Sequence, residues 1–581
     1  MKNKTRKSAH TAIASLSVTA ILAACNSQDN SLPPACTPAS GAVAQARAQV
    51  MSNGRAISSV SGSHIPMAVS SLKDRGLMNE NQALPVTIAL ALNNEDELNQ
   101  RIAEIYQPGN PNYRRFITSQ EFQDRYAPTA QQVADAQSFL VQNGIRVVST
   151  SKSGFLIQAQ APAGALNQAF QTEVHQYAGS SQLKYAPSVD PQMPPGLSIR
   201  AVHGLETPVQ LSHHAVPLAQ IQKQGLGSGP RGGLSPANIR TAYNIPTSVD
   251  GSGETIALVE LDGYNPADIS AYDQAFGLPT TTLVNQMVSG ATGTAGQNSD
   301  EVTLDIELLA AVAPKATIKV YEAPNTSQGL LALYDQIASD NNAQQVSISW
   351  GAAEDNYTIS YLESESQAFR QMAIEGISVY AASGDQGADA NGSKLSVEDP
   401  GTQPFVTAVG GTQLTLTTAG AYGYETTWSS AGGGISAVWP LPTWQKSLAT
   451  SQNRASSSMR NVPDISLNAD PSTGYSIYWN GAWTIYGGTS CATPIWAAFT
   501  ALVNEQRQSS GNPTLGFTNP YLYGLTGQAY TRDFHDIGDG SNNGYYPAVS
   551  GYDDATGLGT LKGTTLFQDL TTEPAQAAAS C

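Results

Sequence analysis

The chain has 581 residues, which is too long for one ordinary hydrophobic core and predicts two or more globular domains. Only 13% of the residues are charged, and the formal net charge is −17 at pH 7. This composition argues against a nucleic-acid-binding surface and against a polybasic membrane patch. Because Lys and Arg are few, the protein would carry little positive self-repulsion in acid, so the composition permits an acidic habitat.

The N-terminus has the pattern of a secretory signal. Four basic residues lie within the first seven positions and precede an apolar run, at about residues 12–24, that is too short to span a bilayer comfortably. The run ends in Leu-Ala-Ala before Cys25, which resembles a bacterial lipobox. We expect a signal peptide over residues 1–25 and a lipid anchor on Cys25, with ordinary signal cleavage nearby as the alternative. A secreted or envelope-anchored protein follows.

Three further cysteines, Cys36, Cys491 and Cys581, are too few for a disulfide framework, and their pairing cannot be deduced from the sequence. Cys491 directly follows Ser490, so a thiol nucleophile is one interpretation. A small buried apolar side chain is the interpretation that we favour, because no histidine lies nearby in the sequence.

Alternating strand and helix patterns predict a first domain over residues 47–205, after a Ser/Pro/Ala-rich tether over residues 26–46. Thr129 has the position of a helix N-cap, and Gly144 that of the stop of the same helix. The other expected elements are strands over residues 85–92, 146–150, 154–160 and 173–177, and helices over residues 94–105 and 164–170. Their order predicts a compact antiparallel α+β domain.

Residues 206–233 are polar and rich in glycine, and they include the pair His213-His214. They have no apolar periodicity that would sustain a helix or strand. We therefore expect a linker without regular elements, and an accessible site for proteolytic cleavage.

Residues 234–581 contain near-continuous apolar strands separated by helical patterns. The strands are expected over residues 255–261, 316–321, 345–350, 377–382 and 405–409, with helices over residues 300–312 and 361–375. Strands buried on both faces are typical of parallel sheets, so the fold class predicted for this domain is α/β with a doubly wound parallel sheet. Functional sites in such sheets lie at the carboxyl ends of the strands.

The strongest local motif is the segment 487–494, GGTSCATP, which precedes an apolar helix over residues 495–503. Small residues allow a sharp turn that exposes the hydroxyl of Ser490 at a helix N-terminus, where backbone dipoles favour developing negative charge. The full motif matches the nucleophile motif shared by subtilisins and sedolisins. A structural turn is the alternative.

A serine nucleophile needs a base, and no histidine lies between His214 and Ser490. Only His535 could serve, and it lies late, in a Gly/Asp-rich loop, which disfavours a Ser-His-Asp triad. Glu301 and Asp305 are four residues apart, so a helix would place both carboxyls on one face. Two adjacent carboxyls do not both ionise readily, which leaves one as a candidate base. A solvated acidic face is the alternative.

A third acid, Asp385, follows a buried strand at the sheet edge where sites form. If burial keeps this carboxyl protonated, it can donate a hydrogen bond to an oxyanion. An ordinary turn aspartate is the alternative.

The chain resembles the sedolisin, or serine-carboxyl peptidase, family, and specifically a kumamolisin-like precursor. The resemblance covers nearly everything after the tether and is carried by residues 113–118, 121–122, 126–129, 233–236, 347–351 and 462–465, besides the motifs above. It implies a subtilisin-like peptidase domain preceded by a ferredoxin-like activation prodomain, which acts as an intramolecular inhibitor.

Carried over by motif, the resemblance assigns Glu301 as general base, Asp305 as the acid that supports it, Asp385 as the oxyanion-stabilising acid and Ser490 as nucleophile. Two further positions, Glu260 and Trp350, match residues that extend the hydrogen-bond network behind the base in some members. The chain departs from the family at Gln386, where serine is frequent, and at Cys491, where a small residue is usual. Neither departure removes a catalytic group.

The resemblance also implies one structural calcium site near the C-terminus. Its ligands would be the carboxylates of Asp536 and Asp553 and the backbone carbonyls of Ile537, Val549 and Gly551, with water completing the shell. A solvated Asp/Gly loop is the alternative.

These inferences predict an acid-active endopeptidase that forms an acyl-enzyme on Ser490 and is made as an autoprocessed precursor. A glutamate base has a reference pKa of roughly 4.3, against roughly 6.5 for histidine, so it still accepts protons in acid. The expected partners are protein or peptide substrates and the protein's own prodomain, and we expect a monomer that binds no nucleic acid. The alternatives are a tripeptidyl-peptidase of the same family, an inert surface-binding lipoprotein, and a subtilisin-like hydrolase that uses His535.

Overall fold

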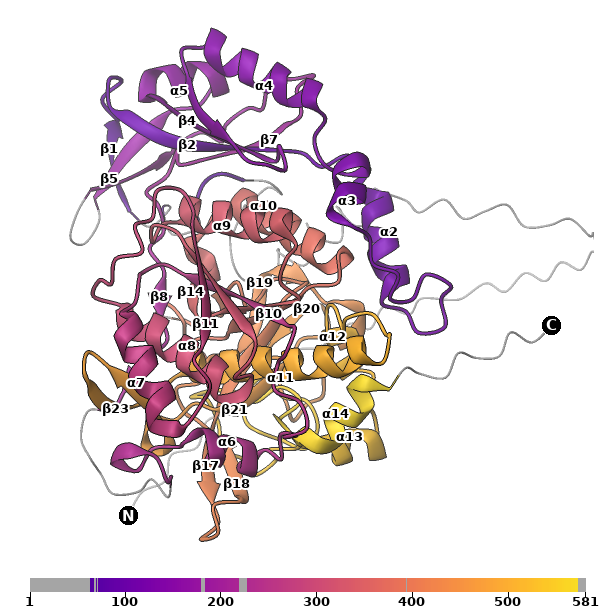
Figure 1. Cartoon of the computed structure of the whole chain (residues 1–581). Helices are drawn as coiled ribbons and strands as arrows, with labels where there is room; N and C mark the ends of the chain where they lie inside the picture. The colour runs from indigo at the N-terminus through magenta and orange to yellow at the C-terminus, as the bar shows by residue number, and fades with distance from the viewer. Residues whose placement is uncertain are drawn as a thin grey trace, which may run out of the picture. The chain divides into compact units, whose positions relative to one another are not determined.

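The computed structural model describes residues 63–66, 69, 72–178, 183–218, 227–392 and 394–572, all of which lie in one unit (Figure 1). The predicted signal peptide, the anchor at Cys25, the tether, Cys36 and Cys581 lie outside the described residues. Within the part that the structure describes, none of the helices is long and apolar enough to cross a membrane.

The N-terminal domain is built on a four-stranded antiparallel sheet with the strand order β3-β4-β2-β7. Its strands are β2 (Ala83–Leu90), β3 (Arg146–Thr150), β4 (Leu156–Pro162) and β7 (Ile199–His203), and its helices are α2 (Glu95–Ile105), α3 (Ser119–Arg125), α4 (Ala130–Gln142) and α5 (Ala163–Phe170). A smaller sheet contains β1 (Lys73–Leu77), β5 (Val174–Ala178) and β6 (Leu183–Pro187). The chain order of the main sheet and its helices is that of a ferredoxin-like domain.

Local sequence signals explain one helix of this domain and fail for another. Thr129 caps α4 as expected, because its hydroxyl accepts a hydrogen bond from the Gln132 amide while the Gln132 side chain binds the Thr129 amide. The sequence pattern missed α3, whose only buried residue is Phe122. One apolar side chain gives no periodicity to detect.

The C-terminal domain contains an eight-stranded sheet with the order β11-β12-β10-β13-β15-β17-β18, in which β21 also pairs with β17. All pairs are parallel except β17 with β18, as expected for the predicted fold class. The strands are β10 (Thr255–Glu260), β11 (Thr282–Met287), β12 (Thr317–Glu322), β13 (Gln345–Ile348), β15 (Ser378–Ala382), β17 (Thr407–Leu416), β18 (Tyr422–Thr427) and β21 (Ile465–Asn468).

Both faces of this sheet are buried. In β10, Ile256 and Leu258 belong to one hydrophobic core with α8 (Ser299–Val312) and α11 (Thr489–Ser509). The alternate residues of the same strand, Ala257 and Val259, belong to a second core with α9 (Ser327–Asp340) and α10 (Ile359–Ile374). Burial on both faces explains why the sequences of these strands are continuously apolar, and do not alternate between apolar and polar residues.

Further short elements of the C-terminal domain are β14 (Trp350–Ala353), β16 (Glu398–Asp399), β19 (Gly434–Pro440), β20 (Met459–Val462), β22 (Tyr475–Trp479), β23 (Ala482–Gly487), β24 (Phe534–His535), β25 (Thr560–Leu561), α6 (Pro236–Ala242), α7 (Pro266–Phe276), α12 (Asn519–Leu522), α13 (Gln528–Asp533) and α14 (Gly563–Thr571). Of these, β14, β16 and β23 border the candidate site.

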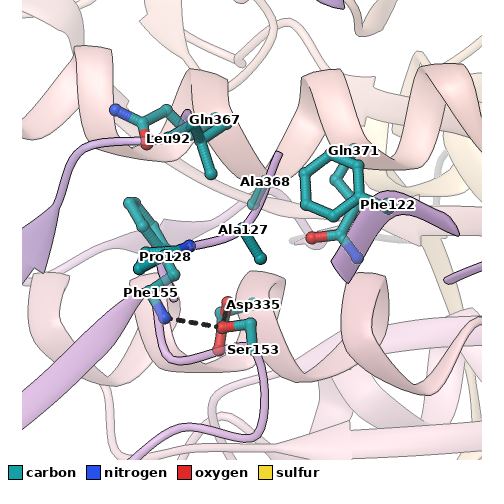
Figure 2. Close-up of a pocket in the computed structure, with 10 residues that line it drawn as sticks. All are labelled: Leu92, Phe122, Ala127, Pro128, Ser153, Phe155, Asp335, Gln367, Ala368 and Gln371. Carbon is teal, nitrogen blue, oxygen red and sulfur yellow. Dashed lines mark hydrogen bonds between the residues drawn. The ribbon is translucent and has the colours of Figure 1, made fainter. Parts of the chain in front are cut away.

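The two domains share a buried contact. Helices α2 and α3 contribute side chains to the same hydrophobic core as α9 and α10. Figure 2 shows a small pocket at this contact, where Phe122, Ser153 and Phe155 of the N-terminal domain face Asp335 and Gln371 of the C-terminal domain. The Ser153 hydroxyl donates a hydrogen bond of 2.7 Å to the Asp335 carboxylate. The N-terminal domain therefore covers apolar surface and a carboxyl group of its neighbour.

The expectation of a linker without regular elements is wrong. The linker forms β8 (Ser212–His213), which pairs antiparallel with β14, and β9 (Val216–Pro217), which pairs antiparallel with β23. Backbone hydrogen bonds to strands of the C-terminal domain hold these residues in extended form. Such pairing needs no apolar periodicity in the linker, so the sequence pattern gave no sign of it.

Candidate active site

Ser490 is the second residue of α11 and is fully buried in this structure. Its amide lies in the first helical turn, where backbone N–H groups have no partner within the helix. The Ser490 hydroxyl donates a long hydrogen bond, 3.5 Å, to the carbonyl oxygen of Ser349, directly after β13. Among the described residues, no hydrogen bond joins Ser490 to Glu301.

The paired acids of α8 lie in the domain interior. Glu301 and Asp305 are both 0% exposed, and the Ser349 hydroxyl donates a 3.0 Å hydrogen bond to Asp305. Burial raises the pKa of Asp305 well above its usual range, and the charges of Glu301 and Glu260 add to this effect. Neither Glu301 oxygen accepts a hydrogen bond from the described residues, although His213 Nδ1 of the linker lies 3.3 Å from one of them.

A further acid extends this group. The Trp350 indole donates a 2.9 Å hydrogen bond to Glu260, the last residue of β10. Burial raises the pKa of Glu260 well above its usual range, although the bond from Trp350 opposes the shift. The structure thus joins these two residues by a hydrogen bond, but among the described residues no hydrogen bond links them to Glu301, so the implied network behind the base stays a prediction.

Asp385 lies beyond the end of β15 and contacts the start of α11. One carboxyl oxygen, Oδ1, accepts hydrogen bonds from the amide and the hydroxyl of Thr489, at 2.9 and 2.8 Å. The other, Oδ2, is buried and has no hydrogen-bond partner among the described residues. Burial raises the pKa of Asp385 to about 7, against the opposing charge of His214. Since Oδ1 is an acceptor in both bonds, a proton on this acid belongs on Oδ2.

The linker crosses the site as an extended strand. Ser212 and His213 pair with Gly351 and Trp350 of β14, and Val216 pairs with Gly487 of β23. The ring of His213 lies edge-on to the Trp350 indole, with 5.6 Å between the ring centroids. The linker therefore contacts both strands that border Ser490.

Two linker histidines approach acids of the site. His213 Nδ1 lies 3.3 Å from a Glu301 oxygen, and His214 Nε2 lies 3.0 Å from a Glu398 oxygen in β16. Burial acts to lower the pKa of His214, but the charge of Glu398 outweighs it and raises the pKa to about 9. Sequence reasoning missed Glu398 altogether, because it belongs to no motif and only the sheet contact of β16 with β14 brings it here.

Gly488 makes room for the linker. Its backbone has φ +107°, and a Cβ atom there would lie 1.6 Å from the His214 carbonyl oxygen and 2.7 Å from Asp385 Oδ2. The His214 carbonyl group is therefore held against the backbone that precedes Ser490, beside the free oxygen of Asp385.

His535 is the alternative base and Cys491 the alternative nucleophile, and their surroundings differ from those of the acids described above. The His535 ring stacks on Tyr422 of β18 with 3.6 Å between centroids, and burial lowers its pKa to about 4. Cys491 is a free, buried thiol whose pKa burial raises well above its usual range. A thiolate is therefore disfavoured at Cys491.

The predicted calcium ligands lie in one loop region. The amide of Gly551 donates to both oxygens of Asp536 at 3.1 Å, and the amide of Val549 donates to Asp553 at 2.9 Å. Asp553 is buried, and burial raises its pKa to about 7. No group of three or more acidic, His or Cys side chains is arranged for a metal within the described ranges. An all-oxygen set with three backbone carbonyls, including that of Ile537, fits calcium and would not form such a group.

Known proteins match most of the chain. The Pro-kumamolisin activation domain matches residues 70–207, and the Subtilase family matches residues 286–519. Kumamolisin from Bacillus sp. (strain MN-32) is 33% identical over 532 residues, which cover 87% of this chain and 94% of that relative. The chain belongs to the sedolisin family of serine-carboxyl peptidases.

Sedolisin from Pseudomonas sp. (strain 101) is 29% identical over 514 residues, or 82% of this chain and 85% of the relative. The solved Pseudomonas sedolisin in complex with pseudo-iodotyrostatin aligns with a TM-score of 0.53 and 29% identity, over 58% of this chain and 98% of that one. The predicted family, the subtilisin-like α/β fold with an N-terminal prodomain, and the serine-peptidase class are confirmed. In this member of the sedolisin family, the N-terminal domain is the prodomain and the C-terminal domain is the peptidase domain.

Gly488→Ala tests the contact between the cleft and an extended peptide chain. The added methyl group would collide with a carbonyl in the position of that of His214 and would lie 2.7 Å from Asp385 Oδ2, so we expect casein hydrolysis to fall by about two orders of magnitude or more. Gly511→Ala is the matched control, because Gly511 also has a positive φ at the other end of α11 but has no heavy atom within 4 Å of the added Cβ. Equal losses in the two variants would contradict this interpretation.

Proposed function

We propose that this sedolisin-family peptidase is an acid-active endopeptidase that cleaves peptide bonds through an acyl-enzyme on Ser490, with Glu301 as general base. The observation that supports this most directly is the extended linker, whose His214 carbonyl lies against Gly488 next to the nucleophile. The inert-lipoprotein alternative gives no reason for a peptide carbonyl to be held at this place.

The first step is a proton transfer. Glu301 accepts the proton of the Ser490 hydroxyl as its oxygen attacks the substrate carbonyl carbon, which forms the tetrahedral intermediate. No hydrogen bond to Glu301 comes from the described residues, and its ion-pair partner, His213 at 3.3 Å, belongs to the linker and would leave the site after cleavage, which supports this role. Asp305 supports Glu301 from one turn further along α8, and the Ser349 hydroxyl orients Asp305.

The oxyanion that forms needs hydrogen-bond donors to stabilise it. The amide of Ser490 is one, and protonated Asp385 is the other, with its proton on Oδ2. The two hydrogen bonds from Thr489 hold Oδ1 as the acceptor and so direct Oδ2 toward the substrate carbonyl. The intermediate then expels the amine, which takes the proton from Glu301, and water hydrolyses the acyl-enzyme by the reverse proton path.

The linker is the first substrate in this proposal. Its backbone pairs with β14 before His214 and with β23 after Ala215, which is the pattern of a substrate bound on both sides of a scissile bond. The bond that lies at Ser490 is therefore His214–Ala215. Its cleavage would separate the prodomain from the peptidase domain.

Cleavage inside chains is favoured over the removal of N-terminal tripeptides. The linker continues upstream of the third residue before the proposed bond, and the Asn325 side chain exchanges two hydrogen bonds of 2.9 Å with the Leu211 backbone. The site therefore holds a fourth residue before the proposed bond. This contact supports the endopeptidase over the tripeptidyl-peptidase alternative.

A structural calcium ion is part of the proposal. Asp536, Asp553 and the carbonyls of Ile537, Val549 and Gly551 would hold it, and the ion would offset the cost of burying the Asp553 carboxylate. The N-terminal pattern supports export of the precursor, with attachment to the cell envelope if Cys25 is lipidated.

Ser490→Ala and Glu301→Gln test the catalytic assignment. In acid, the wild-type precursor should yield a fragment whose N-terminal sequencing starts at Ala215, whereas both variants should remain full length and should cleave casein at least about 10² times more slowly. Because each molecule already holds its own linker in the cleft, the rate constant of the first cleavage should not depend on protein concentration.

His535→Ala is the control for a histidine base and should process normally. Loss of processing in that variant, with retention in Glu301→Gln, would move the base to His535. A first cut at another bond would contradict the alignment of the linker.

Loss of the proton from Asp385 should set the alkaline limit of activity. In the precursor, burial raises the pKa of this acid to about 7 against the charge of His214, so the acid is protonated below that pH and can donate. The rate of the first linker cleavage should therefore fall as the pH rises through about 7. Asp385→Asn keeps a donor that does not titrate, so its activity should be lower but should not decline between about pH 6 and about pH 8. Asp385→Ala should lose a factor of about 10² to 10³. An unchanged alkaline limb in Asp385→Asn would contradict the assignment.

Calcium removal tests the metal site. Chelation should lower the melting temperature of the purified protein by several degrees, because a ligand that binds only the folded state stabilises it, and added Ca²⁺ should restore it. Asp553→Asn should abolish this response. Asp539→Asn changes an exposed acid of the same region and should respond as wild type does. A calcium-independent melting temperature in the wild type would argue against the site.

A further inference from the structure

We infer that the peptidase domain carries a second binding site, remote from Ser490, which takes a phenylalanine ring and a neighbouring tyrosine hydroxyl. Its occupant is the prodomain, which presents Phe116 and Tyr106 there. Because these side chains do not belong to the linker, they should keep the prodomain bound after the linker is cut. The inference is independent of the proposed catalytic mechanism.

The pocket for the ring is formed by two glycines of the peptidase domain. A Cβ atom on Gly376 would lie 2.5 Å from Cδ2 of Phe116, and one on Gly516 would lie 2.6 Å from its Cζ. Both glycines have positive φ, at +83° and +69°, where other residues are strained. The Phe116 ring therefore occupies the space that side chains at these two positions would fill.

The tyrosine hydroxyl meets a donor and an acceptor. The Tyr106 hydroxyl donates a 2.6 Å hydrogen bond to the Ala373 carbonyl in the last turn of α10 and accepts a 2.8 Å hydrogen bond from the Phe517 amide. The two rings of Tyr106 and Phe517 pack edge to face, with 5.8 Å between their centroids. A hydroxyl group can make both bonds at once, because it donates one and accepts the other.

The walls of the site are joined within the peptidase domain. The Thr514 hydroxyl donates a 3.0 Å hydrogen bond to the Gly376 carbonyl, and the Ser378 hydroxyl donates a 2.6 Å hydrogen bond to the Gly516 carbonyl. These bonds connect the loop after α10 to the loop after α11 without using any prodomain atom. The site is therefore built by the peptidase domain, and the prodomain fills it.

The site and the nucleophile lie at opposite ends of the same elements. Gly376 precedes β15, whereas Asp385 follows it. Gly516 follows α11, whereas Ser490 lies at the N-terminus of that helix. Because α11 has 21 residues, its two ends are about 30 Å apart. The linker and this site therefore hold the prodomain at two separate places.

The site also gives a role to residues 113–118, which carry part of the family resemblance and which the proposed chemistry does not use. This segment contains the inserted phenylalanine. The Ile117 amide donates a 3.2 Å hydrogen bond to the Ile374 carbonyl, and the Arg114 guanidinium lies 5.8 Å from the ring centroid of Tyr521 in α12. Figure 1 shows the segment between α2 and α3 close to α12. The motif is therefore a docking segment.

Dissociation of the prodomain from a cut chain tests this inference. The full-length protein carries Ser490→Ala, and a recognition site for an added protease is inserted between residues 218 and 227. After the cut, dilution and size-exclusion chromatography give the dissociation rate constant of the prodomain. Phe116→Ala should raise it at least about thirtyfold, because a buried aromatic anchor dominates binding. Tyr106→Phe keeps the ring but removes both hydrogen bonds, and should raise it about fivefold.

Phe139→Ala is the matched control. Phe139 is a partly buried aromatic residue that packs on a core made of prodomain residues alone, so its rate constant should stay near that of the parent. An unchanged rate constant in Phe116→Ala would overturn the inference. An equal rise in Phe139→Ala would also overturn it, because the effect would then come from a loosened prodomain. Since the added protease makes the cut, failure of the proposed mechanism would leave these results unaffected.

Discussion

The parallel pairing of β10, β13 and β15 is the constraint on which the site depends. Because the three strands are hydrogen-bonded neighbours that run in one direction, their carboxyl ends finish at one edge of the sheet. Glu260, Ser349 and Asp385 follow from these ends, and α8 and α11, which pack on one face, bring Glu301 and Ser490 to the same edge. A change in strand order would separate all five residues.

Burial of the site's carboxyl groups connects this geometry to catalysis in acid. The carboxyl groups of Glu260, Asp305 and Asp385 lie away from water, and burial raises the pKa of each, so the site holds protons that exposed carboxyls would release near neutral pH. The same burial that penalises a charged Asp385 favours the neutral form that can donate to an oxyanion. Stability and the proposed catalysis therefore favour the same low-charge state, which acid supplies.

The linker connects the fold to substrate recognition. It has no pattern of its own, and it becomes strand only because β14 and β23 offer backbone hydrogen-bonding groups on both sides of Ser490. Backbone pairing of this kind is independent of side chains, so selectivity must come from the pockets beside it. In this chain Glu398 lies 3.0 Å from His214 and Glu301 lies 3.3 Å from His213. The same segment is inhibitor and first substrate in our proposal.

The sequence by itself determined the elements with strong local signals: the buried strands of the parallel sheet, the capped helix after Thr129 and the serine turn at Ser490. It also indicated Glu301, Asp305 and Asp385, because helix spacing and strand ends are local properties. Only the tertiary structure decided which acids meet the linker, since the contact of Glu398 with His214 joins residues 184 positions apart through the pairing of β14 with β16 and β8. Pairing between distant strands depends on the sheet as a whole, so no local pattern in the chain reports it.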